Sequence, residues 1–175
     1  GVDCEQHDSF LRHDPVFGWE IGPNRTCRTS VGNERVVYRS NEAGLREPSD
    51  HPSSGDRPRV VVLGDSQTMG SNVNASDRFS DVLERRTDWE VINFGVSGYG
   101  TQQELLTLRR KALVYDPDVV VTTLYLGNDG RDNTGPGSAS RPKPQFRIED
   151  GRPHLKADSI PVPRRRPGSN SITAR

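Results

Sequence analysis

The sequence predicts an α/β fold in which helices cover a parallel β-sheet. Three short apolar runs rich in β-branched residues, at 60–63, 91–94 and 119–126, are typical of strands buried in such a sheet. Two segments with helical periodicity, 76–86 and 101–113, lie between them. Strands that alternate with helices through short connections favour right-handed crossovers, so we expect one open sheet with helices on both faces.

The composition is compatible with one globular domain. The 175 residues carry 24 basic and 24 acidic side chains, and this balance gives no reason to expect a nucleic-acid or membrane partner. No apolar run approaches the roughly 20 residues that cross a bilayer. We predict an irregular N-terminal extension at 1–58, an α/β core at 59–133 and a Pro- and Arg-rich loop or tail at 134–175. The hydrophobic core should lie in the central part, because both ends are polar.

The N-terminal extension holds one β-like run, 35–38, among scattered turn-forming residues. Cys4 and Cys27 flank much of this segment, and a bridge between them would restrict the unfolded chain by roughly 3 kcal/mol. Two unpaired thiols are the alternative. The absence of a His-Cys cluster with metal spacing favours the bridge. A bridge suits an extracytoplasmic or secreted protein, although a cytoplasmic location stays open.

The first half of the core is expected to be a strand followed by a helix. The unbroken apolar run at 60–63 follows a turn cluster at 53–58 and predicts a strand buried on both faces. Ser76 has the residue type of a helix cap, and the helix should end near Arg86. The apolar stripe that faces the sheet should consist of Phe79, Val82 and Leu83.

The second half repeats this pattern after a short strand at 91–94 and a glycine-rich turn. Thr101 and Glu104 have capping-box spacing, which predicts the start of a second helix. Its buried face should contain Leu105, Leu108 and Ala112. The third strand is expected at 119–126, the longest apolar run of the three.

After Asn133 the regular pattern stops, apart from a weak strand-like hairpin around 146–155. The basic run Arg164–Arg166 has no interleaved aromatic residues, so we interpret it as solvated chain and not as a nucleic-acid patch.

Three loops should meet at one edge of the sheet, because the carboxyl ends of parallel strands gather there. The loop tips are Gly64-Asp65-Ser66, Ser97-Gly98-Tyr99 and Gly127-Asn128-Asp129. Acyl transfer needs a nucleophile and preorganised donors for the oxygen that becomes negative. Ser66 offers a hydroxyl and a backbone N–H, Gly98 a second backbone N–H, and Asn128 a side-chain amide. Together they predict a nucleophile with an oxyanion hole.

Each of these residues also has a purely structural explanation. Asp65 and Ser66 suit a turn or a helix cap, Gly98 suits a positive φ, and Asn128 suits an Asx turn. The joint arrangement of three loops favours a site. The spacing of the glycines does not fit a P-loop, which also needs a lysine, or a dinucleotide fingerprint.

The three loop tips resemble the first three sequence blocks of the SGNH hydrolase family, also called GDSL esterases. The resemblance covers about residues 59–133. It implies a three-layer, flavodoxin-like fold with Ser66 as the catalytic nucleophile and Gly98 and Asn128 as oxyanion-hole donors, with no cofactor and no metal. A lead-in like that of bacterial members acting on glycans is formed by Asn41, Gly44, Leu45 and Arg46.

The family's fourth block, an Asp-x-x-His that supplies the general base, is absent. His7, His13 and His51 precede the first strand and are expected at the surface. His154 lies four residues after Asp150, one too many for the block. On this resemblance we expect the C-terminal part of the fold, with its base, to lie outside the chain.

The implied function is a serine esterase that acts on an ester of a carbohydrate or lipid, with O-acetyl groups as candidates. The alternative is a non-catalytic SGNH-like module that binds an acylated glycan or a partner protein. The sequence leaves the substrate and the oligomeric state open.

Overall fold

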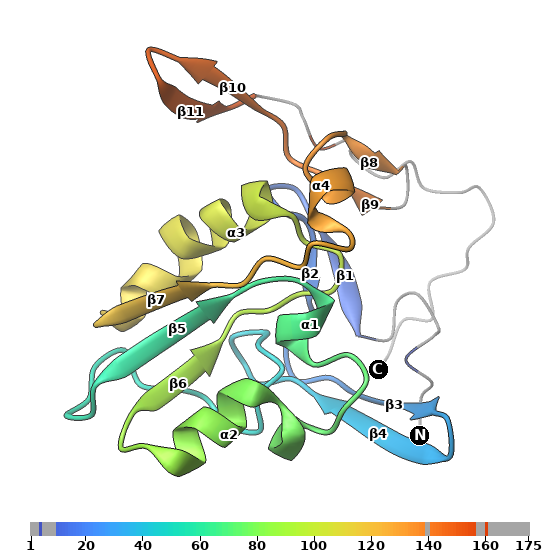
Figure 1. Cartoon of the computed structure of the whole chain (residues 1–175), viewed down its shortest axis with the longest axis vertical. Helices are drawn as coiled ribbons and strands as arrows, with labels where there is room; N and C mark the ends of the chain where they lie inside the picture. Colours follow the sequence, from blue (N-terminus) through green and yellow to red (C-terminus); the bar gives the residue numbers. More distant parts are fainter. Residues whose placement is uncertain (1–3, 5–9, 139–140, 157–159, 161–175) are drawn as a thin grey trace, which may run out of the picture.

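The computed structural model describes residue 4, residues 10–138, residues 141–156 and residue 160. Its centre is a parallel three-stranded sheet in the order β6-β5-β7 (Figure 1). The strands are β5 (Arg59–Leu63), β6 (Glu90–Asn93) and β7 (Val119–Thr122). The predicted α/β fold with a parallel sheet is confirmed.

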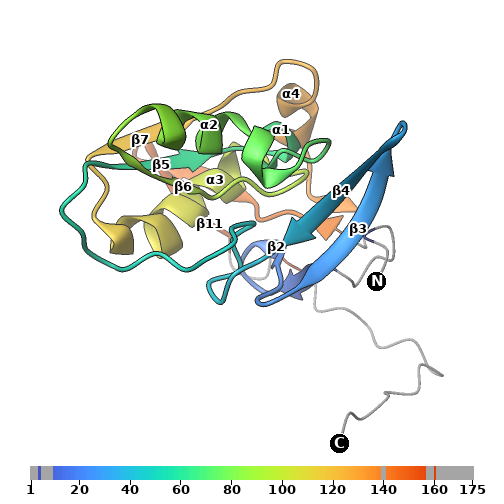
Figure 2. The same ribbon diagram turned by 90° about the horizontal axis from the view of Figure 1, so that it is seen from below.

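Helices cover both faces of this sheet, as Figure 2 shows. On one face, Val60 and Val62 of β5 pack with Val91 and with Leu83 of α2 (Phe79–Arg86). On the other face, Val61 and Leu63 join the cluster that contains Ala112, which follows α3 (Thr101–Thr107). Alternate residues of β5 thus face opposite layers, as expected for a buried parallel strand.

The helix boundaries differ from the prediction in two places. Ser76 lies in a 3-10 turn (Ala75–Asp77), α2 begins after it, and Phe79 is 45 % exposed, so Leu83 and not Phe79 contacts the sheet. The second helix is capped by Gly100 and not by Thr101, because the Gln103 side chain accepts from the Gly100 N–H at 3.2 Å. After α3, the chain continues through one π-helical turn (Leu108–Ala112) and a 3-10 turn (Leu113–Tyr115). Of the predicted face, only Ala112 is fully buried.

The third predicted strand is shorter and more exposed than its apolar sequence suggests. It forms β7 but, among the residues that the structure describes, pairs only with β5, so it lies at the edge of the described sheet. Val119 is 41 % exposed, and Leu126, beyond the strand, is 95 % exposed. A β-branched run predicts a strand, but it carries no information about the strand's place in the sheet. Within the described ranges, no helix combines the length and apolar content that would span a bilayer.

The N-terminal segment is not irregular: it forms two β-hairpins. These are β1 (Leu11–Asp14) with β2 (Gly18–Ile21), and β3 (Thr26–Val31) with β4 (Glu34–Arg39). Their aromatic and aliphatic side chains form one cluster with residues of the α/β layers: Phe10, Phe17, Trp19, Ile21, Val36, Tyr38, Met69, Val96, Tyr99 and Leu106. The expectation of a core confined to the central part is therefore wrong, because the N-terminal hairpin segment supplies more than half of a second core.

The segment after β7 is mostly short elements. They comprise α4 (Asp129–Asp132), β8 (Gly137–Ser138), β9 (Arg141–Pro142), β10 (Phe146–Glu149) and β11 (Arg152–Leu155). The last two pair as an antiparallel hairpin, which confirms the one predicted around 146–155. The basic run at 164–166 lies outside the described residues.

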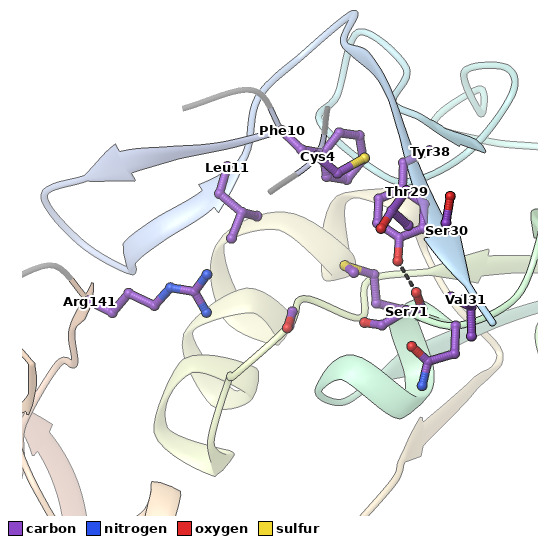
Figure 3. Close-up of a pocket in the computed structure, with 12 residues that line it drawn as sticks. Cys4, Phe10, Leu11, Thr29, Ser30, Val31, Tyr38, Ser71 and Arg141 are labelled. Carbon is purple, nitrogen blue, oxygen red and sulfur yellow. Dashed lines mark hydrogen bonds between the residues drawn. The ribbon is translucent and has the colours of Figure 1, made fainter. Parts of the chain in front are cut away.

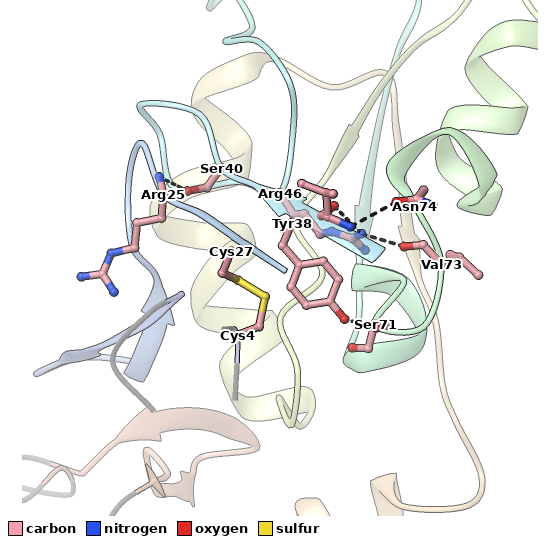
Figure 4. The surroundings of a disulfide bond; sticks show 10 residues. Cys4, Arg25, Cys27, Tyr38, Ser40, Arg46, Ser71, Val73 and Asn74 are labelled. Carbon is pink, nitrogen blue, oxygen red and sulfur yellow. Dashed lines mark hydrogen bonds between the residues drawn. A yellow bond between two sulfur atoms is a disulfide. The ribbon is translucent and has the colours of Figure 1, made fainter. Parts of the chain in front are cut away.

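Cys4 and Cys27 form a disulfide beside the β3-β4 hairpin (Figure 4), as the sequence favoured. Cys27 is buried in the cluster shared by the hairpins and the α/β layers. The bridge therefore ties the start of the described chain to the second core.

Reduction of this disulfide should lower the free energy of unfolding by about 3 kcal/mol, because the bridge closes a loop with a sequence separation of 23. Urea unfolding with and without dithiothreitol measures the difference. The paired variant Cys4→Ala/Cys27→Ala is the control, since its stability should not respond to dithiothreitol. An unchanged midpoint for the reduced wild type would contradict the expectation.

Candidate active site

Asp65 connects the first and third loops. Its Oδ1 accepts from the Gln67 N–H at 2.8 Å and caps the short helix α1 (Ser66–Met69). Its Oδ2 accepts from the Asn128 side-chain amide, also at 2.8 Å. The capping explanation of Asp65 is therefore correct, but the same carboxylate also fixes the side chain predicted as an oxyanion donor. A carboxylate can only accept, so it determines which end of the Asn128 amide faces Asp65.

The second loop is held against α1 by Asn93, the last residue of β6. The Asn93 amide donates to the Thr68 carbonyl and to Ser80 Oγ, each at 2.8 Å, and its Oδ1 accepts from the Gly95 N–H at 2.9 Å. Both amide hydrogens and the oxygen of the Asn93 side chain are thus hydrogen-bonded inside the protein, where unpaired polar groups are costly. This network fixes the positions of the first two loops relative to each other.

The backbone N–H groups of Ser66 and Gly98 donate to no other residue that the structure describes. Ser66 is the first residue of α1, so its N–H has no acceptor within the helix. Gly98 has φ +80°, a left-handed conformation that favours glycine. A Cβ at Gly98 would only touch Trp19 at 3.5 Å and Arg141 at 3.7 Å, so the backbone conformation and not a lack of space explains this glycine.

Ser66, Gly98 and Asn128 line one cavity of about 380 Å³. The structure thus brings the three predicted site residues together at the carboxyl ends of the strands. The remaining lining residues are Trp19, Ser97, Arg131, Asp132, Gly137, Ser138, Arg141 and Lys143. The catalytic roles of Ser66, Gly98 and Asn128 stay a prediction.

Trp19 enters the cavity from the N-terminal hairpin and was not predicted as a site residue. Its indole N–H donates to the Ser97 carbonyl at 3.1 Å, and its own carbonyl accepts from the Tyr99 hydroxyl at 2.7 Å. These bonds attach β2 to the second loop on both sides of Gly98. Hydrophobic periodicity could not reveal Trp19, because it belongs to a segment that reads as irregular.

None of the three histidines that the structure describes lines this cavity. His13 is exposed on β1. His51 was expected at the surface, but its ring is mostly buried and its Nδ1 lies 2.9 Å from Glu90 Oε1. His154 lies on β11, half exposed, with Nδ1 4.0 Å from Glu149. His7 lies outside the described residues.

A buried acid, Glu104 of α3, lies close enough to the first and third loops for their carboxylates to affect its pKa. Both of its carboxyl oxygens are buried without a hydrogen-bond partner. Burial, followed by the negative charges of Asp129 and Asp65, raises the pKa of Glu104 from its ordinary 4.5 to about 7. The protonated form of Glu104 is therefore favoured in the folded protein at mildly acidic pH.

This shift predicts a stability that falls as the pH rises. The folded state binds the Glu104 proton more tightly than the unfolded state, so its contribution is complete below about pH 4.5 and is lost as the pH rises through about 7. Glu104→Gln should leave stability near pH 4.5 almost unchanged and raise the free energy of unfolding at pH 8 by about 3 kcal/mol. Urea unfolding at both pH values tests this, with the exposed Glu34→Gln as control. Equal effects at the two pH values would contradict it.

Two further cavities adjoin the first. One of about 370 Å³ shares Ser97 and Arg141 with it and is lined by apolar side chains such as Phe10 and Leu11 together with polar ones (Figure 3). The other, of about 220 Å³, shares Ser66 with the first cavity. An extended molecule bound at Ser66 would therefore find further space beyond the first cavity.

Comparison of the sequence with models of known protein families gives no match, and comparison with curated proteins gives none. Among solved structures, a mutant of the esterase AlinE4 is similar with a TM-score of 0.37 and 24 % sequence identity. The match covers 47 % of this chain and 47 % of that esterase, so the chain spans about half the length of its structural neighbour. Similarity at this level carries no conclusion about function, which has to come from the cavity.

Proposed function

We propose that this protein is a serine ester hydrolase of the SGNH type with Ser66 as nucleophile. One observation carries the proposal: Ser66, Gly98 and Asn128 line the same cavity. The backbone N–H groups of Ser66 and Gly98 also have no hydrogen-bond acceptor among the described residues. Free backbone donors beside a candidate nucleophile are the parts that acyl transfer requires.

In the proposed reaction, Ser66 Oγ bonds to the ester carbonyl carbon, the carbonyl π bond opens onto its oxygen, and the hydroxyl proton passes to solvent water. The carbonyl oxygen becomes negative and is stabilised by the N–H groups of Ser66 and Gly98 and by the Asn128 amide. Collapse of this intermediate breaks the bond to the leaving oxygen, which takes up a proton from water and departs as the alcohol. Water then hydrolyses the acyl group on Ser66, which releases the acid and restores the hydroxyl. Without a histidine at the cavity among the described residues, the hydroxyl is weakly activated, and oxyanion stabilisation supplies the remaining rate enhancement.

We propose acyl esters, such as O-acetyl groups, of a carbohydrate or lipid as the substrate class, and an extracytoplasmic location. The disulfide between Cys4 and Cys27 supports an oxidising compartment. The second cavity, with its partly apolar lining, offers room for a group beyond the reacting ester.

The test compares the wild type with Ser66→Ala. Wild type should hydrolyse p-nitrophenyl acetate faster than the variant, and a fluorophosphonate probe should label wild type only. Ser54→Ala, at an exposed position before β5, is the matched control and should retain labelling. Equal hydrolysis by wild type and Ser66→Ala, together with no labelling of either, would refute the hydrolase and favour a binding module for acylated glycans or a partner protein.

A further inference from the structure

The cavity at Ser66 has an excess of positive charge that the chain as a whole does not have. Three of its lining residues are cationic, Arg131, Arg141 and Lys143, and one is acidic, Asp132. The complete sequence has a net charge of zero, so this excess is local.

Two of these cations share the single carboxylate. Asp132 Oδ1 lies 3.5 Å from Lys143 Nζ and 3.6 Å from Arg131 Nε. Lys143 also donates to the Asp132 backbone carbonyl at 2.9 Å and is almost completely buried. The carboxylate and the lysine therefore form a structural pair.

Arg141 has no such partner. Within the described part of the chain, its guanidinium makes no ion pair or hydrogen bond, and it lies 5.9 Å from the centroid of the Trp19 ring. A Cβ built on Gly98 would lie 3.7 Å from Arg141 Nη1, so the guanidinium lies directly beside the proposed oxyanion donor. The side chain reaches toward the second cavity as well (Figure 3).

We infer that Arg141 recognises an anionic group of the substrate, placed next to the reacting ester. This inference rests on the proposed function. A guanidinium presents five donors in a planar fork that matches carboxylate, phosphate and sulfate oxygens. Because Arg141 lines both cavities and its guanidinium lies beside Gly98, this group would lie next to the carbonyl that Ser66 attacks. Arg131, another lining residue and largely exposed, adds to the attraction.

Three acetyl esters on the same aromatic ring serve as probes: para-acetoxybenzoate, para-acetoxybenzenesulfonate and the neutral methyl para-acetoxybenzoate. Calorimetry with the Ser66→Ala protein measures binding without turnover. The anionic probes should bind about tenfold more tightly than the neutral ester. Arg141→Gln in the same background should abolish this preference, whereas Arg110→Gln, an exposed arginine away from the cavity, should retain it. A stronger preference for one anionic probe separates carboxylate from sulfonate recognition.

The outcomes separate the two proposals. Equal affinity for anionic and neutral probes, or a preference that survives Arg141→Gln, would overturn the anion site even where Ser66-dependent hydrolysis is observed. Conversely, a charge preference that depends on Arg141, in a protein whose ester hydrolysis does not depend on Ser66, would support the anion site and reject the hydrolase. With active wild type, Arg141→Gln should lower kcat/KM for the anionic esters about tenfold and leave that for the neutral ester unchanged.

Discussion

Replacing Arg46 by methionine should lower the free energy of unfolding by about 4 kcal/mol, because it leaves several buried carbonyls without a donor. Arg46 is 1 % exposed. Its guanidinium donates to four backbone carbonyls, those of Val37, Met69, Gly70 and Val73, and stacks on the Tyr38 ring at 4.0 Å (Figure 4). Burial, and next the charge of Arg78, lower the pKa of Arg46 to about 10, so it stays protonated at neutral pH.

The carbonyls that Arg46 binds belong partly to the end of α1 and the loop that follows it, so the loss should also reach Ser66. Urea unfolding measures the stability change, and fluorophosphonate labelling of the folded variant measures the effect at the serine. Arg39→Met, at an exposed position of β4, controls for the loss of a positive charge. A loss below about 1 kcal/mol would show that the carbonyls find other donors.

The role of Arg46 illustrates what local sequence patterns miss. A single arginine in a polar segment gives no physical signal of burial, and Arg46 stands out in the sequence only as part of a lead-in that resembles a known family. The structure supplies the reason for that lead-in: Asn41 Oδ1 accepts from the Leu45 N–H at 2.9 Å, and Gly44 has φ +73°. The turn that they form positions the Arg46 side chain in the buried interior, beside the end of α1.

The parallel strands were predictable because burial on both faces of a sheet requires continuous apolar sequence, as in β5. The exposure of a strand was not predictable in this way, because β7 has the same residue types as β5 and yet lies at an edge of the described sheet. The loop tips at Ser66, Gly98 and Asn128 followed from the rule that carboxyl ends of parallel strands share one edge. Trp19 and Arg141 reach the cavity from segments before and after the α/β layers, and their placement depends on tertiary contacts that no local pattern encodes.

Asn128→Ala should lower kcat for p-nitrophenyl acetate about 10²- to 10³-fold, the effect of removing one oxyanion donor. Asp65 Oδ2 holds one amide hydrogen of Asn128 at a donor–acceptor distance of 2.8 Å. The second amide hydrogen remains for the cavity that Asn128 lines with Ser66. This donor meets a full negative charge only after Ser66 has attacked, so it stabilises the transition state more than the bound ester.

The division of the effect between kcat and KM decides the role of Asn128. A transition-state donor lowers kcat and leaves KM nearly unchanged, whereas a residue that only binds the ester raises KM. Asn33→Ala, in the exposed turn between β3 and β4, should change neither constant. Thermal unfolding of Asn128→Ala separates a catalytic loss from a structural one, because Asp65 loses a partner in that variant. An increase in KM with kcat preserved would remove Asn128 from the oxyanion hole and leave the two backbone N–H groups as its donors.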